Sequence, residues 1–446
     1  MSGIAHLLLR QGNKVSGSDL KPSAVTEELQ KCGAQIYIGH AAENLNSAEE
    51  VIYSTAIKED NPELIAAEKK KLPITRRAQA LAGLMKECNV ITVTGSHGKT
   101  TTSSLAAYIL MEANFMPTVV IGGILKNIDN NACLGKGSYF VAEADESDGS
   151  FLYYRPKFSI ITNIDREHLD YFKDFESELK AFKSFINQTR SEGCLFLCYD
   201  DINLRNISRD YRGKVVYFGL NENADIFAKE IIRKGLSGEF DCYYKRKFIG
   251  RFSLPLAGLH NISNSLAAVA LGLELGIDTP VILKALANFK GAKRRMDVKF
   301  DDGKSMVIDD YAHHPTEIIA TLAAAKGLGK RTLAVFQPHR YSRTKLLLDD
   351  FAKAFDIADC LIITDIYPAG EAEIPGISAE LIYEKVKQHD PVKKVYFSPY
   401  QELGKEIMRL YKEGDLILVL GAGDITKVSD GISQILKSKS QACRAA

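Results

Sequence analysis

A glycine-rich segment at residues 94–101, TGSHGKTT, carries the residue types of a phosphate-binding loop. It follows an apolar stretch at 89–94 and precedes a helical pattern at 103–111, the strand–loop–helix order that such a loop requires. Glycines let backbone N–H groups converge on phosphate oxygens, Lys99 supplies a charge to the β- and γ-phosphates, and the Thr100 hydroxyl can bind magnesium. The sequence therefore predicts an ATP site built from Gly95, Ser96, His97, Gly98, Lys99, Thr100 and Thr101.

The spacing between the two glycines of this loop is two residues shorter than in the general GxxxxGK[ST] pattern. The alternative is a glycine-rich turn between a strand and a helix, with a lysine on the surface. We favour the phosphate loop because both the flanking strand and helix and the Lys-Thr-Thr ending match what such a loop requires.

Acidic residues follow a second predicted strand at residues 139–142, in the run EADESD at 143–148. Carboxylates at this spacing repel one another, and beside a nucleotide's phosphates a hard divalent cation offsets the repulsion. The run therefore indicates magnesium. A third apolar strand at 159–164 is followed by His168, which is either a ligand of a second metal ion or a surface histidine.

The composition describes an ordinary globular protein with a net charge of +1, 46% hydrophobic and 25% charged residues. No basic excess suggests nucleic-acid binding. The apolar runs are too short to cross a bilayer, and the N-terminus lacks the order of a signal peptide, so we expect a cytoplasmic protein without a membrane partner. Eight scattered cysteines form neither a CxxC pair nor a zinc-ligand pattern, and we expect them to be reduced.

Short β-branched runs alternate with longer helical segments throughout the chain, which predicts an α/β fold with parallel sheets and about three domains. Residues 1–86 form a small, doubly wound, Rossmann-like domain, residues 87–288 a central P-loop domain with a mostly parallel sheet, and residues 289–446 a Rossmann-like C-terminal domain. The expected strands of the first and third domains lie at 14–18, 35–38, 50–53, 306–308, 332–336, 360–364 and 415–420.

These motifs, in this order, resemble the Mur ligase family over nearly the whole chain. The motifs that carry the resemblance are GSHGKTT at 95–101, EADESD at 143–148, TNID at 162–165 with His168, GLHNISN at 258–264, Arg294-Arg295, DDYAHHPTE at 309–317 and QPHRYSRT at 337–344. The resemblance implies an ADP-forming amide-bond ligase. It would join L-alanine to the lactyl carboxylate of UDP-N-acetylmuramate through an acyl phosphate, in peptidoglycan precursor synthesis, as a monomer or weak homodimer.

The resemblance also implies roles for individual residues. Lys99 would hold the ATP phosphates, Thr100 and Glu143 would bind one magnesium ion, and His168 would bind another. The residues implied at the adenine and along the nucleotide are His260, Asn261, Asn264, Arg295 and Asp310. The residues implied around the amino acid and the reacting carboxylate are Tyr311, His313, Arg340 and Arg343.

Each of these roles has a plain structural alternative. His260-Asn261 would also serve as a helix cap, Arg294-Arg295 as a solvated basic hinge, and His313-His314 as a turn ahead of a helix. Lys183 lies near the position where some family members carry a carbamylated lysine, but we do not include it among the expected site residues.

The chain departs from the family at its N-terminus. Members usually begin with a strand and a GxGGxGM loop, and this sequence starts at the Met of that motif. We therefore expect the first strand and the pyrophosphate-binding loop to be missing, either through a misassigned start or with a loss of uridine-nucleotide binding. Asp19, Ser54 and Thr55 remain candidates for contacting that nucleotide.

Other activities stay open at this stage. A family member that recycles murein peptides would add a preformed tripeptide in place of alanine. Folate polyglutamylation is less favoured because nothing in the first domain indicates a pteridine site. A degenerate nucleotide-binding protein, or a phosphate-loop motor or switch, would bind ATP without needing an amino acid.

Overall fold

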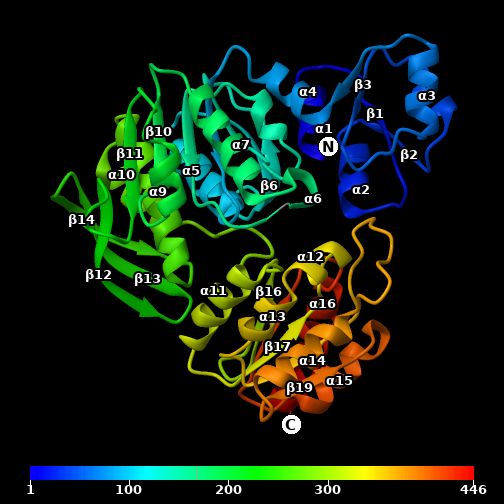
Figure 1. Ribbon diagram of the computed structural model, residues 1–446, viewed down its shortest axis with the longest axis vertical. Helices are drawn as coiled ribbons and strands as arrows, with labels where there is room; N and C mark the ends of the chain where they lie inside the picture. The colour runs from blue at the N-terminus through cyan, green and yellow to red at the C-terminus, as the bar shows by residue number, and fades with distance from the viewer. Residues whose placement is uncertain (168, 446) are drawn as a thin grey trace. The chain divides into compact units, whose positions relative to one another are not determined.

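The computed structural model describes residues 1–167 and 169–445, and the fold is α/β throughout (Figure 1). The chain divides into two compact units. The first comprises Met1–Lys229, Cys242–Gly250 and Ser263–Phe289, and the second Glu230–Asp241, Arg251–Ile262 and Lys290–Ala446. His168, predicted as a metal ligand, lies outside the described residues.

The N-terminal part of the first unit, for which a small doubly wound, Rossmann-like domain is predicted, alternates short strands with helices. Its strands form two separate parallel pairs, β1 with β2 and β3 with β4. Each strand has only three or four residues and none of these is buried. The elements are α1 (Ser2–Arg10), β1 (Ser16–Asp19), α2 (Ala24–Lys31), β2 (Gln35–Ile38), η1 (Ala42–Leu45), β3 (Val51–Tyr53), α3 (Pro62–Lys69), β4 (Ile74–Arg76) and α4 (Arg77–Leu84).

A ten-stranded sheet follows within the described chain, in the order β14-β13-β12-β11-β10-β9-β5-β8-β6-β7. Its strands are β5 (Asn89–Thr94), β6 (Thr118–Leu125), β7 (Asn130–Cys133), β8 (Tyr139–Glu143), β9 (Phe158–Ile161), β10 (Cys194–Cys198), β11 (Val215–Gly219), β12 (Ile226–Lys234), β13 (Ser237–Tyr244) and β14 (Lys247–Leu254). The accompanying helices are α5 (Lys99–Glu112), η2 (Ser150–Tyr153), α6 (Leu169–Phe172), α7 (Phe175–Gln188), α8 (Ile202–Ile207), α9 (Leu259–Glu274) and α10 (Thr279–Ala287).

Strand β5 determines where the predicted chemistry gathers, because it pairs in parallel with both β8 and β9. The carboxyl ends of parallel strands meet at one edge of a sheet. The glycine loop after β5, the acidic run after β8 and the segment after β9 therefore lie together. The strand–loop–helix order predicted around residues 95–98 is confirmed, with α5 beginning at Lys99.

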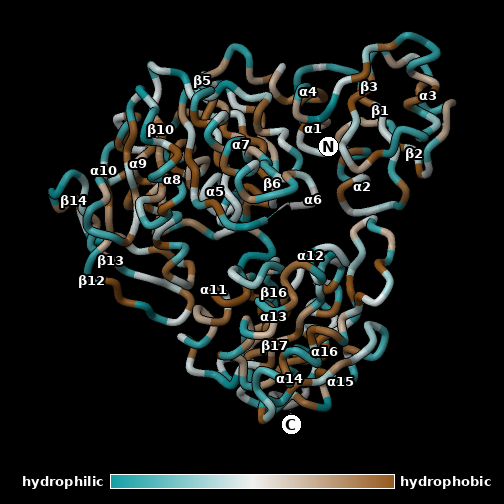
Figure 2. Tube along the Cα trace, in the orientation of Figure 1, coloured by the Kyte–Doolittle hydropathy of each residue, from teal (hydrophilic) through white to brown (hydrophobic). Residues whose placement is uncertain are grey.

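Helix α7 is amphipathic and buries one of its faces in this unit. In Figure 2 its tube changes between hydrophobic and hydrophilic along its length, and Phe182, Phe185 and Ile186 are buried. Glu178 is the exception on the buried face, with no solvent exposure at all.

A second sheet of six described strands forms the C-terminal part, in the order β15-β16-β20-β17-β18-β19. Only the β15–β16 pair among these is antiparallel. The strands are β15 (Asp297–Asp301), β16 (Met306–Asp310), β17 (Thr332–Phe336), β18 (Cys360–Ile363), β19 (Lys394–Phe397) and β20 (Leu416–Leu420). The helices are α11 (Pro315–Lys326), α12 (Tyr341–Leu346), α13 (Leu348–Ala354), α14 (Ala379–His389), η3 (Tyr400–Glu402), α15 (Leu403–Leu410) and α16 (Thr426–Ala445).

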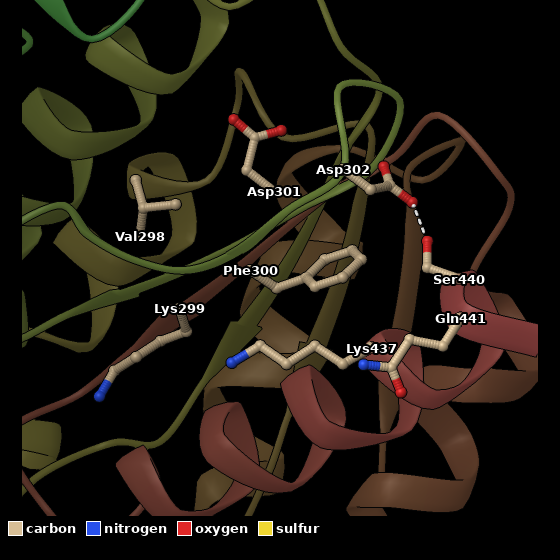
Figure 3. Close-up of a pocket in the computed structure, with 8 residues that line it drawn as sticks. All are labelled: Val298, Lys299, Phe300, Asp301, Asp302, Lys437, Ser440 and Gln441. Atoms are coloured by element: carbon tan, nitrogen blue, oxygen red, sulfur yellow. Dashed lines mark hydrogen bonds between the residues drawn. The ribbon is translucent and has the colours of Figure 1, made fainter. Parts of the chain in front are cut away.

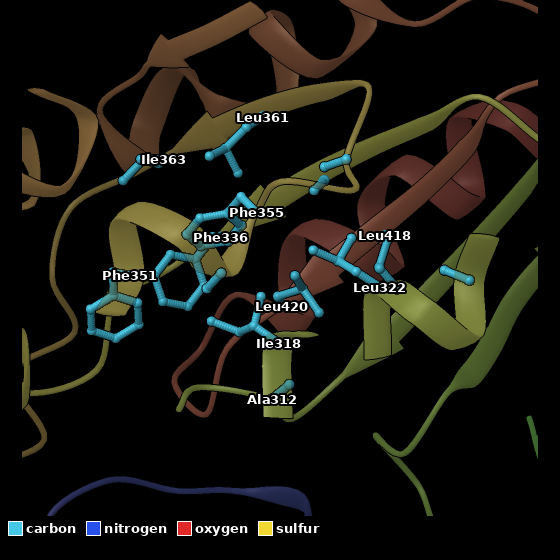
Figure 4. Packing of buried hydrophobic residues seen from close by; sticks show 14 of the residues in the cluster. Ala312, Ile318, Leu322, Phe336, Phe351, Phe355, Leu361, Ile363, Leu418 and Leu420 are labelled. Carbon is cyan, nitrogen blue, oxygen red and sulfur yellow. The ribbon is translucent and has the colours of Figure 1, made fainter. Parts of the chain in front are cut away.

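Alternate residues of these strands enter two hydrophobic cores, as the two-residue period of a strand requires. Ile308 and Phe336 pack with Ile318 of α11 and Phe351 of α13 in one core. Figure 4 shows Phe336, Ile318 and Phe351 in this core. The neighbouring residues Val307 and Val335 pack with Ile407 of α15 and Ile432 of α16 in the other. Helices thus cover both faces of the sheet, and the ends of its strands stay available for a site.

Two further expectations from the sequence concern the membrane and the thiols. Among the described residues, no helix is both long and apolar enough to cross a bilayer. The cysteines that the structure describes are free thiols, which are Cys32, Cys88, Cys133, Cys194, Cys198, Cys242 and Cys360. The domain boundaries at 86/87 and 288/289 stay predictions.

Candidate functional site

The glycine loop leaves no room for side chains at its two glycines. Gly95 and Gly98 have φ angles of 124° and 85°, a region that side-chain-bearing residues rarely adopt. A Cβ at Gly98 would lie 2.6 Å from Oδ1 of Asn264, and one at Gly95 would overlap the Thr162 hydroxyl. The backbone is therefore bare at both positions, as a phosphate cradle requires.

Lys99 lies at the start of α5 and turns its side chain back over the loop. Its Nζ donates to the carbonyl oxygens of Gly95 (2.7 Å) and Ser96 (3.1 Å), and to Oε1 of Glu146 (2.6 Å). Burial favours the neutral amine, but the carboxylates of Glu146 and Asp145 raise the pKa of Lys99 above its usual value. The ammonium stays charged at neutral pH.

An oxygen-rich cluster surrounds Glu143 at the end of β8. Its Oε1 accepts from the Thr100 hydroxyl at 3.3 Å. Its Oε2 accepts from the Gly122 N–H at 2.9 Å and, more weakly, from the Ser103 hydroxyl at 3.5 Å. Hydroxyl and carboxylate oxygens are the ligands that magnesium prefers, so this donor set fits the predicted ion.

The segment after β9 clamps the glycine loop from the side. Asn163 Oδ1 accepts from the His97 N–H at 2.9 Å, and its Nδ2 donates to the His97 carbonyl at 3.0 Å. The Thr162 hydroxyl donates to the same carbonyl at 2.5 Å, and His97 Nε2 shares a hydrogen bond with Asp165 Oδ2 at 3.0 Å. His97 is thus part of the loop's framework.

Lys183 points to a different place on the molecule. Its ammonium lies 2.7 Å from Asp210 Oδ2, and both side chains are largely exposed. This pairing supports leaving Lys183 out of the expected site.

Helix α9 carries the residues predicted at the adenine. The side chain of Asn264 packs against Gly98 of the loop. Asn261 donates from Nδ2 to the Ala257 carbonyl at 2.7 Å, so its amide fixes the segment entering the helix. Burial and the nearby Arg295 lower the pKa of His260 to about 4, which keeps this imidazole neutral.

In the second unit, the loops after the parallel strands β16 and β17 bring another predicted group together. Tyr311 and His313 follow β16, and their rings lie 5.3 Å apart. The His313 ring lies 5.5 Å from that of His339, which follows β17, and Arg343 donates from NH1 to His339 Nδ1 at 3.3 Å. Arg340 lies between His339 and Arg343 in sequence, so the predicted amino-acid site is one cluster of cationic and imidazole groups.

The basic pair at 294–295 belongs to this cluster and is not a solvated hinge. Both guanidinium groups lie over the Tyr311 ring, at 5.0 and 5.1 Å from its centre. Arg294 also donates to the Gly421 carbonyl at 2.5 Å, after β20.

His313 and His339 differ in the groups that their ring nitrogens face. His313 Nδ1 lies 3.0 Å from the Tyr311 carbonyl oxygen and 3.1 Å from a Glu317 carboxylate oxygen, so this nitrogen carries a hydrogen. Burial, followed by the nearby His313 and arginines, lowers the pKa of His339 to about 3. His339 is therefore a neutral acceptor for Arg343.

The side chains of His314 and Asp310 accept hydrogen bonds from backbone N–H groups of this region. His314 is the N-cap of α11 and accepts from the Thr316 N–H, as the turn alternative predicts. Asp310 accepts from the N–H groups of Met296 (2.6 Å) and Ala312 (2.9 Å). Burial nevertheless raises the pKa of Asp310 to about 6.

The residues predicted to contact the uridine nucleotide lie on different strand pairs. Asp19 ends β1 and is exposed, whereas Ser54 and Thr55 follow β3. A polar network beside Asp19 was not predicted: Glu63 accepts from the Ser18 hydroxyl at 2.8 Å, and Ser18 shares a hydrogen bond with His40 at 2.9 Å. The signal in the sequence is the position of His40, which comes two residues after the end of β2.

A pocket elsewhere in the second unit contains none of the predicted residues. It lies between β15 and α16 (Figure 3), where Asp302 accepts from the Ser440 hydroxyl at 2.9 Å. Its lining comprises Val298, Lys299, Phe300, Asp301, Asp302, Lys437, Ser440 and Gln441.

Three family models together match most of the chain. They are described as "Mur ligase family, catalytic domain" at residues 1–88, "Mur ligase middle domain" at 93–272, and "Mur ligase, glutamate ligase domain" at 294–423.

Similar proteins cover nearly the full length. A UDP-N-acetylmuramate--L-alanine ligase from Geobacter sp. (strain M21) is 44% identical over 98% of this chain and 95% of its own length. One of the same name from Aquifex aeolicus (strain VF5) is 45% identical over 96% and 93%. The structure of UDP-N-acetylmuramate-alanine ligase from Thermotoga maritima superposes with a TM-score of 0.85 and 30% identity, over 98% of this chain and 97% of that one. A murein peptide ligase from Psychrobacter arcticus reaches a TM-score of 0.71 and 25% identity, over 98% and 96%.

Proposed function

Since this chain belongs to the Mur ligase family, we propose that it joins L-alanine to the lactyl carboxylate of UDP-N-acetylmuramate, with conversion of ATP to ADP and phosphate. The chain has a three-domain Mur ligase fold. The observation that carries the proposal is that one chain holds both kinds of site such a reaction needs. The first unit has a bare glycine loop with Lys99 and the Thr100–Glu143 pair, and the second has the arginine–histidine cluster.

Activation of the carboxylate is the first chemical requirement, because a carboxylate does not condense with an amine at neutral pH. Attack of the lactyl carboxylate on the γ-phosphate would give an acyl phosphate and ADP. Lys99 would place its charge at the β- and γ-phosphates, and the N–H groups of the loop would bind phosphate oxygens. Thr100 and Glu143 would hold one magnesium ion and His168 another, and these ions would supply positive charge against the phosphates when bound.

Formation of the amide bond is the second requirement. The alanine amine must be neutral to attack the acyl carbon, after which phosphate leaves. Arg340 and Arg343 would hold carboxylates as guanidinium groups do, in forked geometry. His313, with its hydrogen on Nδ1, presents Nε2 as the nitrogen able to take a proton from the amine.

The test is magnesium-dependent release of phosphate from ATP, with UDP-N-acetylmuramate and L-alanine both present and then each omitted. We expect release only when both are present. Release without an amino acid would contradict the proposal and favour a nucleotide hydrolase. Release that requires a murein tripeptide in place of L-alanine would assign the chain to the peptide-recycling activity instead.

A further inference from the structure

Arg340 has a strained backbone. Its φ and ψ angles are 72° and 139°, a combination that residues other than glycine rarely adopt. Such strain persists only where the surrounding contacts over-determine it, and it concentrates at functional sites. The contacts that hold Arg340 therefore bear on what its side chain does.

The main chain of Arg340 is fixed on both sides. Its N–H donates to the Tyr367 carbonyl at 2.8 Å, and the Tyr367 N–H donates to the Pro338 carbonyl at 2.8 Å. Its own carbonyl accepts from the N–H and the hydroxyl of Thr344, at 3.2 and 3.0 Å. Residue 367 belongs to the segment between β18 and α14, so this segment holds the strained residue in place.

The same segment carries Glu371, which grips the start of α12. The Glu371 N–H donates to the Pro368 carbonyl at 3.0 Å, closing a turn through Ala369 and Gly370, both at positive φ. Its Oε1 then accepts from the Ser342 hydroxyl at 2.6 Å and its Oε2 from the Ser342 N–H at 3.1 Å.

The Glu371 carboxylate also faces the charge of Arg340. Oε1 lies 3.9 Å from NH1 of Arg340, and the side chains are only 23% and 38% exposed. At this distance the pair is electrostatic, while the short bonds to Ser342 fix the carboxylate itself. One carboxylate thus connects the backbone just after Arg340 to its guanidinium group.

We propose that Glu371 is a positioning residue that acts through Arg340, by aiming the guanidinium group at the carboxylate of the amino-acid substrate. This role rests on the proposed function, because it requires Arg340 to bind the amino acid. It gives a reason for the strained backbone of Arg340. Tyr367 fixes the main chain of this residue by a hydrogen bond, and Glu371 attracts its side chain.

The kinetic test compares Glu371→Gln in two backgrounds, wild type and Arg340→Lys. Gln keeps one of the two oxygen acceptors for Ser342 and removes the charge. In wild type we expect KM for L-alanine to rise about fivefold, because the loss of a partly exposed ion pair weakens binding only modestly. KM for ATP should stay unchanged within twofold. In the Arg340→Lys background the same change should have less than half of that effect. Equal effects in both backgrounds, or an equal rise in KM for all three substrates, would overturn the proposal.

Matched controls separate positioning from folding. Asp349→Asn removes an exposed ion pair with Lys385 in the same unit and should leave every KM unchanged. Ser342→Ala keeps the Glu371 charge and should raise KM for L-alanine less than Glu371→Gln does. A larger effect of Ser342→Ala would show that Glu371 only anchors the helix.

A readout without substrates distinguishes failure of this proposal from failure of the proposed function. The Nε–H signal of Arg340 in an ¹⁵N NMR spectrum, assigned by its loss in Arg340→Lys, should shift in Glu371→Gln and stay in place in Asp349→Asn. An inactive wild-type chain with this shift would contradict the proposed function alone. An unchanged signal would overturn the contact between Glu371 and Arg340, whatever the activity.

Discussion

The Lys99 ammonium lies 2.6 Å from Glu146 Oε1, and the Glu146 side chain has no solvent exposure. Lys99 is therefore both the residue that would bind phosphate and the partner of a buried carboxylate. The Thr94 hydroxyl also donates to Glu146, at 3.3 Å. Because one charge serves structure and activity, substitutions at the two residues should separate the two roles.

Lys99→Met should lower the free energy of unfolding by about 3 kcal/mol, because it leaves the Glu146 charge buried without its ammonium partner. Adding Glu146→Gln should restore most of this stability, since a neutral amide costs less to bury. Phosphate release should stay undetectable in both variants, because neither has a charge for the phosphates. Urea denaturation and the phosphate assay measure the two quantities.

The matched control for this pair is Lys183→Met, which breaks the exposed pair with Asp210. Its free energy of unfolding and its activity should both be unchanged, because exposed ion pairs contribute little to stability. A double variant no more stable than Lys99→Met would contradict the assignment of Glu146 as the structural partner of Lys99.

Gly98→Ala should abolish binding of ATP, measured by isothermal titration calorimetry. The new Cβ would lie 2.6 Å from Asn264 Oδ1, at a φ of 85°, so the loop must shift. Gly83→Ala in α4 is the control, because its Cβ would meet no atom within 4 Å. That change should stabilise the protein by about 0.5–1 kcal/mol and leave ATP binding intact. Normal ATP affinity in Gly98→Ala would argue against the loop as the phosphate site.

Glu143→Gln should raise the magnesium concentration that gives half-maximal phosphate release by roughly tenfold or more, because an amide oxygen replaces a charged ligand. Chelation of magnesium should stop release from the wild-type chain reversibly. A magnesium titration at fixed ATP measures both effects. Glu112→Gln is a control on α5, since Glu112 pairs with Lys284. An unchanged magnesium requirement in Glu143→Gln would remove Glu143 from the metal site.

The parts of the site that the sequence predicted are those in which a local pattern carries the chemistry. The loop at 95–101 has its glycines, lysine and threonines in one segment, between an apolar strand and a helix. The Arg340–Arg343 segment was reached through the resemblance to a family. In both cases neighbouring residues define the motif, so no knowledge of long-range packing was needed.

The parts that were missed depend on contacts between distant segments. Glu146 stood in the predicted acidic run, but its pairing with Lys99, 47 residues away, follows from the parallel pairing of β5 and β8. Glu371 lies in a loop without a motif. The backbone of Arg340 is strained by its surroundings, and its positive φ cannot be predicted from the residue type. The N-terminal strands matched in position, but they pair as β1 with β2 and β3 with β4 in two separate sheets.

Glu178 was missed for a related reason, since a glutamate on an amphipathic helix usually faces water. Here burial, followed by the charges of Glu146 and Glu167, raises its pKa to about 8, and a backbone hydrogen bond from Glu167 opposes this shift only in part. In the unfolded chain it titrates near 4.5. Between these values the folded protein holds a proton that the unfolded chain has lost. The free energy of unfolding must therefore fall as the pH rises through this range.

Glu178→Gln should remove this dependence on pH. The variant should gain on the order of 3 kcal/mol relative to wild type when the pH is raised from 5 to 8.5, whatever its stability at pH 5. The cost of burying the amide is the same at both pH values, so it cancels when the free energies of unfolding at the two values are subtracted. Urea denaturation at both values measures it, and Glu176→Gln, an exposed residue of the same helix paired with Lys180, should show no such gain. Parallel pH profiles for wild type and Glu178→Gln would mean that Glu178 is ionised in the folded protein and would contradict this prediction.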